Sequence, residues 1–332
     1  MPNLTTAIIV PCYNEESTIG EVIEEFRASL PDAAIFVYDN NSADRTAEVA
    51  QAHGALVRRE RAQGKGNVVR RMFADIDADV YVLVDGDSTY PASAAPSMIR
   101  LLLDENLDMV TAKREPVIEH AYRPGHRFGN RLLTGVVSAL FGKGVSDMLS
   151  GYRVLSRRFV KTFPALASGF EIETELTVHA LEMRMAISEV STPYMARPEG
   201  STSKLSTYRD GLGILRTVAN LVRDERPFAF FSVLASIFLF LAIVLSIPVF
   251  IEYSISGLVP RLPTAVLCTG LALISVVLFS CGLILDTVSL GRREMKRLHY
   301  LRFPNDVGGL AGGTNELSGH LSRTDRAESV GV

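Results

Sequence analysis

The stretch VYVLVDGD, residues 80–87, is an apolar run of β-forming residues that ends in two carboxylates one residue apart. A short run without polar residues indicates a strand that is buried on both faces, as in a parallel sheet. Carboxylates beside a core are costly unless a positive group meets them. Alternation along an extended chain places Asp85 and Asp87 on the same side, and Gly86 permits a tight turn between them. Two hard oxygen ligands favour Mg²⁺ or Mn²⁺, although a solvated Asp-Gly turn has the same letters.

Other apolar runs occur on both sides of this stretch, and helical patterns separate them. These runs lie at residues 6–10, 34–38 and 107–111. Strand–helix alternation predicts an α/β fold with a mostly parallel, Rossmann-like sheet and helices on both faces. Ser17 is expected to cap the first helix and Asp44 the second, and two more helices are expected to begin near Lys65 and Pro91.

Polar residues follow the predicted strands at their carboxyl ends, where open α/β sheets bind ligands. Tyr13 can stack on a base, and Asn14 or Glu15 can accept a hydrogen bond from it. Asp39 can bind a base imide or a ribose hydroxyl. Capping of the next helix or an Asx turn explains the same residues without a ligand. The sequence Gly64-Lys65-Gly66 adds a flexible loop, a cation and a helix N-terminus, all suited to a phosphate.

Basic residues in the middle of the chain give a second set of candidates. Arg123, Arg127 and Arg131 recur every four residues, so on a helix near residues 125–141 they share one stripe. The stripe can receive an anionic ligand or lipid headgroups, and a solvated cationic face is an equally good explanation. The polar loop at residues 197–204 contributes Arg197, Ser203 and Lys204. A loop placed just before a membrane segment can hold a phosphate at the bilayer surface.

Two stretches, residues 228–251 and 262–285, contain no charged residue. Each is about 36 Å long as a helix, enough to cross a bilayer core of about 30 Å with some tilt. The segment 206–227 before them has an apolar stripe and is expected to be an amphipathic helix lying in the membrane interface. Basic residues follow the second stretch, in a segment (286–332) that ends in a polar, Gly- and Ser-rich tail expected to be disordered.

The positive-inside rule places the basic segment, and with it a catalytic domain at residues 1–205, on the cytoplasmic side of the cytoplasmic membrane. No signal-peptide pattern precedes the first predicted strand, which agrees with a cytosolic domain. The mean hydropathy of +0.19 is high for a soluble enzyme. A formal net charge of −3 gives no support for a nucleic-acid partner. Three scattered cysteines form neither a disulfide framework nor a zinc motif.

The ordered set of motifs resembles the family 2 glycosyltransferases of the GT-A fold. The matched stretches are Ile9-Val10-Pro11-Cys12-Tyr13-Asn14-Glu15, Asp39-Asn40-Asn41-Ser42-Ala43-Asp44-Arg45-Thr46, Gly64-Lys65-Gly66, and Asp85-Gly86-Asp87 followed by Pro91. Two later stretches, Ser150-Gly151-Tyr152-Arg153 and residues 200–205, resemble the polyprenyl-phosphate branch of that family. This branch contains the dolichyl-phosphate mannose synthases and the bacterial enzymes of the GtrB and ArnC type.

The resemblance implies transfer of a sugar from a nucleotide donor, preferably UDP-linked, to a polyprenyl phosphate, with inversion at the anomeric carbon. It implies Mg²⁺ or Mn²⁺ as the cofactor, contact with membrane lipids, and assembly into a homo-oligomer such as a tetramer. The metal would be held by Asp85 and Asp87. The residues implied in nucleotide-sugar binding are Pro11, Tyr13, Asn14, Glu15, Asp39, Asn41, Lys65, Asp85 and Arg114.

The same resemblance implies that Asp87, Asp147 and Glu173 face the reacting centre as catalytic residues. The candidates for contact with the acceptor phosphate are Arg127, Arg131, Arg153, Arg197, Ser203 and Lys204. Thr89 stands where the family often has a glutamine that can contact the metal, so the metal shell differs here.

Three other functions compete with this interpretation. A processive polysaccharide synthase carries a Q-x-x-R-W signature, which a chain without tryptophan cannot contain. A glycosyltransferase acting on another lipid or glycan acceptor shares most of the same motifs, and the Ser-Lys loop and the membrane segments count against it. A non-catalytic membrane adaptor that binds nucleotide sugars is the third alternative, and the intact Asp85 and Asp87 argue against it.

Overall fold

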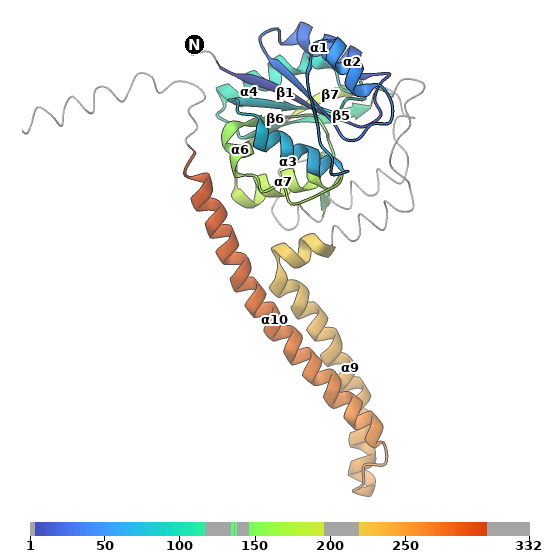
Figure 1. Cartoon of the computed structure of the whole chain (residues 1–332). Coiled ribbons are helices and arrows are strands. Elements are labelled where there is room, and N and C mark those ends of the chain that lie inside the picture. Colours follow the sequence, from blue (N-terminus) through green and yellow to red (C-terminus); the bar gives the residue numbers. More distant parts are fainter. Residues whose placement is uncertain (1–3, 117–133, 136, 138–145, 196–218, 304–332) are drawn as a thin grey trace, which may run out of the picture. The chain divides into compact units, whose positions relative to one another are not determined.

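The computed structural model describes residues 4–116, 134–135, 137, 146–195 and 219–303 (Figure 1). The chain divides into two compact units. One unit contains residues 1–123, 144–203 and 299–332, and the other contains residues 124–143 and 204–298.

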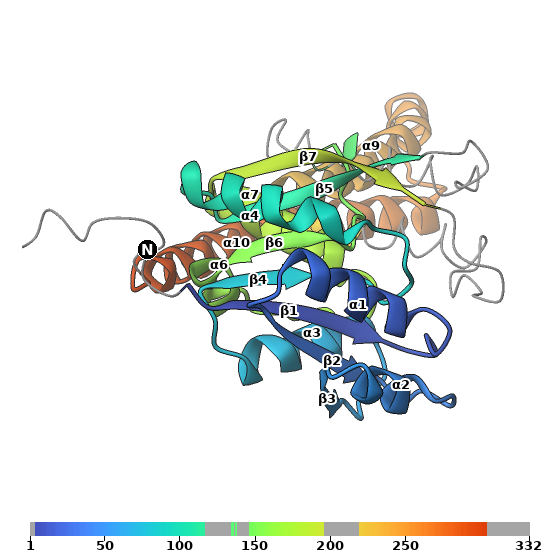
Figure 2. The ribbon, with the colours of Figure 1, turned by 90° about the horizontal axis from the view of Figure 1, so that it is seen from above.

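The first unit is built on a seven-stranded sheet with the strand order β3-β2-β1-β4-β6-β5-β7 (Figure 2). Its strands are β1 (Thr6–Cys12), β2 (Ala34–Asp39), β3 (Leu56–Arg59), β4 (Val80–Leu83), β5 (Met109–Pro116), β6 (Arg153–Ser156) and β7 (Ile187–Tyr194). The pairs that involve β6 are antiparallel, and the others are parallel. The predicted mostly parallel α/β sheet is therefore confirmed.

Helices cover both faces of this sheet, as the alternating pattern predicts (Figure 1). They are α1 (Ile19–Ser29), α2 (Thr46–Ala52), α3 (Lys65–Asp75), the short η1 (Ala92–Ala94), α4 (Ala95–Asp104), α6 (Arg157–Thr162) and α7 (Ile172–Met183). One apolar core packs α1 and α4 against the sheet, and a second core packs α3, α6 and α7 on the opposite face. Strands β1, β2 and β4 run parallel, so their carboxyl ends lie at one edge.

Several element boundaries differ from the sequence-based expectation. The expected cap at Ser17 is wrong, because Thr18 occupies the N-cap position of α1 and donates its hydroxyl to the Gly86 carbonyl at 2.7 Å. The expected cap at Asp44 is also displaced by one residue, because Arg45 is the N-cap of α2, although the Asp44 carboxylate accepts from the Thr46 amide at 3.0 Å. Strand β3 was not expected, because it is a four-residue edge strand that ends in two arginines.

The second unit contains two long helices, α9 (Pro227–Ser256) and α10 (Leu262–Tyr300), of which α10 ends in the first unit. Both are long and apolar enough to cross a membrane, and both are longer than the predicted spans. Their packing seam consists of small residues. On α10 these are Cys268, Ser275, Gly282 and Ser289, and on α9 they are Ala235 and Ala242. The seven-residue spacing is typical of helices packed along a continuous seam. Of the expected interfacial helix, residues 206–218 lie outside the described part.

Candidate functional site

The loops that follow β1 and β2 are joined by hydrogen bonds between their polar residues. The Ser42 hydroxyl accepts from the Asn14 amide at 2.9 Å, and the Asn14 side-chain oxygen accepts from the Ala43 amide at 2.8 Å. The Glu15 amide donates to the Thr46 hydroxyl at 2.9 Å. Asn14 therefore fixes one loop against the other, whatever further contact it makes with a nucleotide. The Tyr13 side chain beside it is 37% exposed, which leaves its ring accessible for stacking.

A second asparagine, Asn40, is a site residue that the sequence analysis did not select. Its side chain donates to the carbonyls of Glu60 and Ala62 at 3.0 and 2.8 Å and accepts from the Gly64 amide at 2.7 Å. Asn40 thus shapes the loop that ends at Lys65. The signal was an Asn-Asn pair directly after a strand, a place where asparagine side chains bond to nearby backbone.

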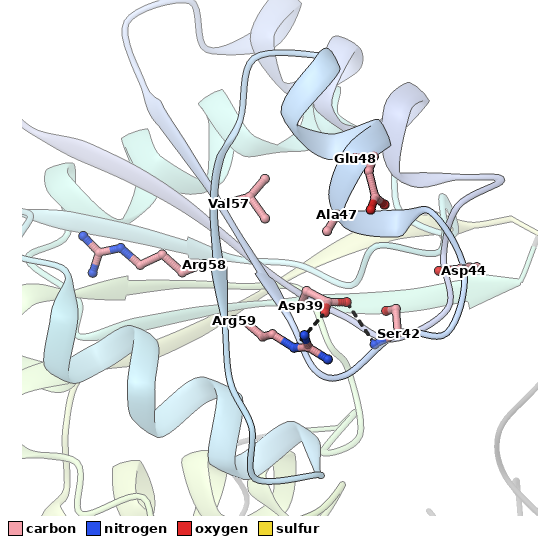
Figure 3. A pocket seen from close by; sticks show the side chains of 8 residues that line it. All are labelled: Asp39, Ser42, Asp44, Ala47, Glu48, Val57, Arg58 and Arg59. Atoms are coloured by element: carbon pink, nitrogen blue, oxygen red, sulfur yellow. Dashed lines mark hydrogen bonds and ion pairs between the residues drawn. The ribbon is translucent and has the colours of Figure 1, made fainter.

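Asp39, at the end of β2, is buried beside a surface pocket (Figure 3). One carboxylate oxygen accepts from the Ser42 amide at 3.1 Å, and the other lies 3.9 Å from Nε of Arg59. The pocket has a volume of about 250 Å³, near the lower limit of about 300 Å³ for small-molecule sites. Its lining residues are Asp39, Ser42, Asp44, Ala47, Glu48, Val57, Arg58 and Arg59. The Asp39 carboxylate and the Arg59 guanidinium line the same pocket and can recognise the donor and acceptor groups of a base or ribose.

The two carboxylates that follow β4 are held in different ways. Asp85 has 27% of its side chain exposed and forms an ion pair with Lys65, while Asp87 is buried. One oxygen of Asp87 accepts from the Thr89 hydroxyl at 2.6 Å and from the Thr89 amide at 3.3 Å. Thr89, at the position where the family often has glutamine, therefore orients a carboxylate. In the described part of the chain no three His, Cys, Asp or Glu side chains gather around one point.

This donor set fits a divalent metal of the Mg²⁺ or Mn²⁺ type. Such ions often take one or two carboxylates from the protein and complete their shell with water and substrate phosphates. The Asp85 carboxylate already holds a cation, the Lys65 ammonium, at 2.5 Å. Asp85 is thus placed to neutralise positive charge, which supports its proposed role as a metal ligand.

Lys65 lies between two carboxylates at the start of α3. Its ammonium is 2.5 Å from an oxygen of Asp85 and 2.5 Å from an oxygen of Glu173, which is on α7. Burial disfavours the charged form of Lys65 and by itself would lower its pKa. The attraction of the two carboxylates outweighs burial and raises the pKa of Lys65 above its ordinary value. Burial raises the pKa of Glu173, and the negative charge of Asp85 adds to the rise against the opposing attraction of Lys65. The sequence-predicted Lys65, Asp85 and Glu173 therefore form one buried cluster.

Close backbone approach explains three glycines around this cluster. A Cβ on Gly151 would lie 2.1 Å from a carboxylate oxygen of Asp85. Cβ atoms on Gly64 and Gly66 would each lie 2.2 Å from a backbone oxygen of the loop at residues 167–168. A side chain at Gly64 or Gly66 would force the backbone to shift, and one at Gly151 would force the Asp85 carboxylate to move. The glycine of Ser150-Gly151-Tyr152-Arg153 is therefore needed because the Asp85 carboxylate packs on it.

Arg153 is fully buried, and its guanidinium donates to groups of the protein itself. The acceptors are the carbonyls of Ser150, Met148 and Glu173, at 3.1, 2.8 and 3.0 Å, and the Thr177 hydroxyl at 2.8 Å. This geometry counts against the predicted contact with an acceptor phosphate, because the side chain is removed from solvent and its donors have partners. Arg153 is better explained as a positioning residue that joins the loop before β6 to the first turn of α7.

Arg114 and Asp147, which were predicted in separate roles, bind each other. Nε and Nη2 of Arg114 donate to the two oxygens of Asp147 at 2.7 Å each, and the Arg114 amide adds a bond at 3.2 Å. Burial alone would raise the pKa of Asp147, but the hydrogen bonds and charge of Arg114 outweigh it and leave the pKa below its ordinary value. Asp147 is therefore a carboxylate that stays ionised, and Arg114 orients it.

The remaining predicted residues differ in how far the structure describes them. Pro11 lies near the end of β1 and Asn41 follows β2, where the Asn41 side chain donates to the Arg61 carbonyl at 2.8 Å. The other acceptor-phosphate candidates are Arg127, Arg131, Arg197, Ser203 and Lys204, and they lie outside the described residues. Their predicted contacts stay predictions.

Comparison with known proteins relates the chain to glycosyltransferases. Residues 7–163 match the family model described as Glycosyl transferase family 2. The glycosyltransferase AglJ of Haloferax volcanii is 31% identical over 304 residues, which are 89% of this chain and 97% of AglJ. The dolichyl-phosphate hexose transferase of the same organism is 28% identical and covers 66% of this chain and 95% of its own length.

Among solved structures, glucosyl-3-phosphoglycerate synthase of Mycobacterium tuberculosis has a similar fold. Its complex with Mn²⁺, UDP and glucosyl-3-phosphoglycerate aligns with a TM-score of 0.54 at 25% identity, over 66% of this chain and 79% of that chain. The similarity covers two thirds of this chain at a moderate TM-score, so it supports the architecture of the sheet and its helices.

Proposed function

Since the chain belongs to the family 2 glycosyltransferases, we propose that it transfers a sugar from a UDP-sugar to a polyprenyl phosphate at the cytoplasmic face of the cytoplasmic membrane. Sugar transfer is the activity of the family, and the donor and acceptor are the proposed part. One observation carries the proposal. The same chain has a buried Asp85–Lys65–Glu173 cluster at the carboxyl edge of its sheet and two helices of membrane-spanning length.

The donor assignment rests on the pocket beside Asp39 and on one structural relative. That relative, glucosyl-3-phosphoglycerate synthase, has been solved with UDP and Mn²⁺. The acceptor assignment is supported by a relative named dolichyl-phosphate hexose transferase, since dolichyl phosphate is a polyprenyl-type lipid phosphate. An acceptor with a long apolar tail also agrees with the many exposed apolar side chains of α9 and α10.

The proposed reaction needs positioning and charge neutralisation more than it needs a strong base. An oxygen of the lipid phosphate is already anionic at neutral pH and attacks the anomeric carbon. The new carbon–oxygen bond forms as the bond from that carbon to the diphosphate breaks, and the configuration inverts. A Mg²⁺ or Mn²⁺ ion held by Asp85 and Asp87 would neutralise charge on the leaving diphosphate.

The residues of the chain have separate tasks in this scheme. Tyr13 stacks on the base, and Asp39 accepts hydrogen bonds from the base or ribose. Thr89 keeps the Asp87 carboxylate in one orientation. Lys65 supplies positive charge at the diphosphate. Glu173 and Asp147 hold Lys65 and Arg114 in place, so that cations face the anionic reactants in fixed positions.

The decisive experiment uses the purified full chain in detergent with Mn²⁺, a panel of UDP- and GDP-sugars, and a polyprenyl phosphate. Mass spectrometry should detect a polyprenyl-phosphate-sugar with one donor of the panel. Parallel reactions with the polyprenol that lacks the phosphate, and with diacylglycerol, test the acceptor. A sugar product on diacylglycerol alone would refute the proposed acceptor and leave the family activity in place.

A pair of aspartate variants makes the same assay specific for the site. Asp87→Ala should abolish product formation while circular dichroism and membrane extraction stay unchanged. Asp104→Asn, at the exposed end of α4, removes a negative charge far from the proposed site and should keep wild-type turnover. Wild-type turnover by Asp87→Ala would refute the metal assignment.

A further inference from the structure

The Lys65 ammonium occupies one of the two carboxylate oxygens through which Asp85 could bind a divalent cation. The ammonium and an Asp85 oxygen are 2.5 Å apart, and 8% of the Lys65 side chain is exposed. The second partner, Glu173, is also buried, with 10% of its side chain exposed. A metal cannot approach that oxygen of Asp85 at bonding distance while the ammonium occupies it. Metal binding through this oxygen therefore requires a change at Lys65.

The Lys65 ammonium has the properties of a cation that another cation can displace. An ammonium is a point charge on a flexible stem, and it makes no bidentate fork with a carboxylate. Glu173 gives Lys65 a second carboxylate that can keep hold of the ammonium after it leaves Asp85. Asp85 is the more exposed of the two carboxylates, at 27%, so it is the one that an incoming ion can reach. The other oxygen of Asp85 packs against the backbone of Gly151, where an added Cβ would lie 2.1 Å from it.

We propose that Lys65 is an exchangeable internal counter-ion of the metal site. Without metal, its ammonium neutralises Asp85 and Glu173. When a divalent cation arrives with a nucleoside diphosphate, the cation takes Asp85, and the ammonium stays with Glu173 and turns toward the diphosphate. This inference rests on the proposed function, because it assumes a metal-bound diphosphate at Asp85. It explains why one lysine is tied to a proposed metal ligand and also lies at a proposed phosphate site.

The test is Mn²⁺ binding to the full chain in detergent, measured by electron paramagnetic resonance of the free ion, with and without UDP. Lys65→Gln should bind Mn²⁺ about tenfold more tightly than wild type when UDP is absent, because the competing cation has gone. UDP should then improve Mn²⁺ binding less in the variant than in wild type, because the diphosphate has lost its ammonium partner. Lys161→Gln is the matched control, since its ammonium contacts Ile76 and Asp77 outside the site.

A double variant separates a change in Mn²⁺ binding from a loss of folding. Lys65→Gln leaves Glu173 buried without its cation, whereas Lys65→Gln combined with Glu173→Gln removes both charges together. The double variant should also bind Mn²⁺ more tightly than wild type without UDP. Mn²⁺ binding by the double variant that equals or falls below that of wild type would overturn the exchange. The measurement uses neither sugar nor lipid, so a failed transfer assay beside tighter Mn²⁺ binding would refute only the proposed donor or acceptor.

Discussion

Two acidic clusters in the sheet unit neutralise a carboxylate in different ways. Asp108, at the start of β5, is fully buried and accepts two hydrogen bonds from Arg158, at 2.9 Å each. The hydroxyls of Ser156 and Tyr300 add bonds at 3.0 and 2.9 Å. Asp85 is partly exposed, and among the described residues its side chain has one hydrogen-bond donor, the Lys65 ammonium.

The difference separates a structural carboxylate from the one proposed to bind the metal. Four donors, two of them on one rigid guanidinium, fix both oxygens of Asp108 and leave no direction from which a ligand can approach. One ammonium on a flexible stem neutralises Asp85, and a different cation can displace it. We therefore base the proposed assignment on the number and geometry of the donors around each carboxylate as well as on burial.

The largest expected effect comes from removing the charge of the proposed metal ligand. Asp85→Asn should lower sugar transfer on the order of 10³-fold, because it removes a proposed metal ligand at the leaving diphosphate. Its free energy of unfolding should change by no more than about 1 kcal/mol, because Lys65 keeps Glu173 as a partner. Transfer rates and thermal melting by circular dichroism measure the two effects. A large loss of stability with retained transfer would make Asp85 a structural residue like Asp108.

The reverse result is expected at the structural cluster. Asp108→Asn should reduce the free energy of unfolding by about 3 kcal/mol, because Arg158 is left without its counter-charge in a buried place. Transfer per folded molecule should stay near that of wild type at a temperature well below the melting point. Thermal melting and single-temperature assays on the same preparation separate the two quantities. Equal losses of transfer in Asp108→Asn and Asp85→Asn would end the distinction between the clusters.

The sequence predicted β1, β2, β4 and β5, and the polar residues that follow the first three of them, because both depend on local patterns. The run at residues 80–84 is apolar throughout, and the carboxylates follow it directly, so the position of Asp85 at the sheet edge could be read without coordinates. The partners of those residues could not be read. Lys65 is 108 positions from Glu173, and Asp108 is 192 positions from Tyr300. Contacts at that separation depend on how β5, β6 and α7 are arranged, and one sequence carries no signal for that.

Arg153 also shows that the partners of a charged residue cannot be predicted from local sequence. An arginine in a short polar motif was expected to bind a phosphate, and nothing local distinguishes that role from a buried one. The structure satisfies its guanidinium with the carbonyl of Met148, five positions away, and with that of Glu173 on α7, 20 positions away. Residue type and spacing therefore predicted that polar residues follow the strands at the sheet edge, but not which charged groups bind each other.

A smaller effect is expected from a change that only moves Asp85. Gly151→Ala would place a Cβ 2.1 Å from an Asp85 oxygen, so the carboxylate has to shift. Mn²⁺ affinity in the presence of UDP should fall about tenfold, and melting should change little. Gly291→Ala is the control, because an added Cβ meets no atom within 4 Å there. Unchanged Mn²⁺ binding in Gly151→Ala would show that the position of Asp85 is not what this glycine protects.

The smallest effect concerns Asp147, which shares features of both clusters. A bidentate arginine holds it, as in the Asp108 cluster, yet it was expected at the reacting centre, like Asp85. Its pKa in the folded chain lies below the ordinary value, so its ion pair stabilises the fold above a pH of about 4 and is lost as the pH falls through the lowered pKa. Asp147→Asn should lower the melting temperature at neutral pH, by the equivalent of about 1 kcal/mol, and should flatten its decline on acidification. Melting curves from pH 3 to 7 on both proteins test this. A transfer loss as large as that of Asp85→Asn, with an unchanged dependence of the melting temperature on pH, would group Asp147 with Asp85. It would also show that a bidentate arginine does not exclude a role in the reaction.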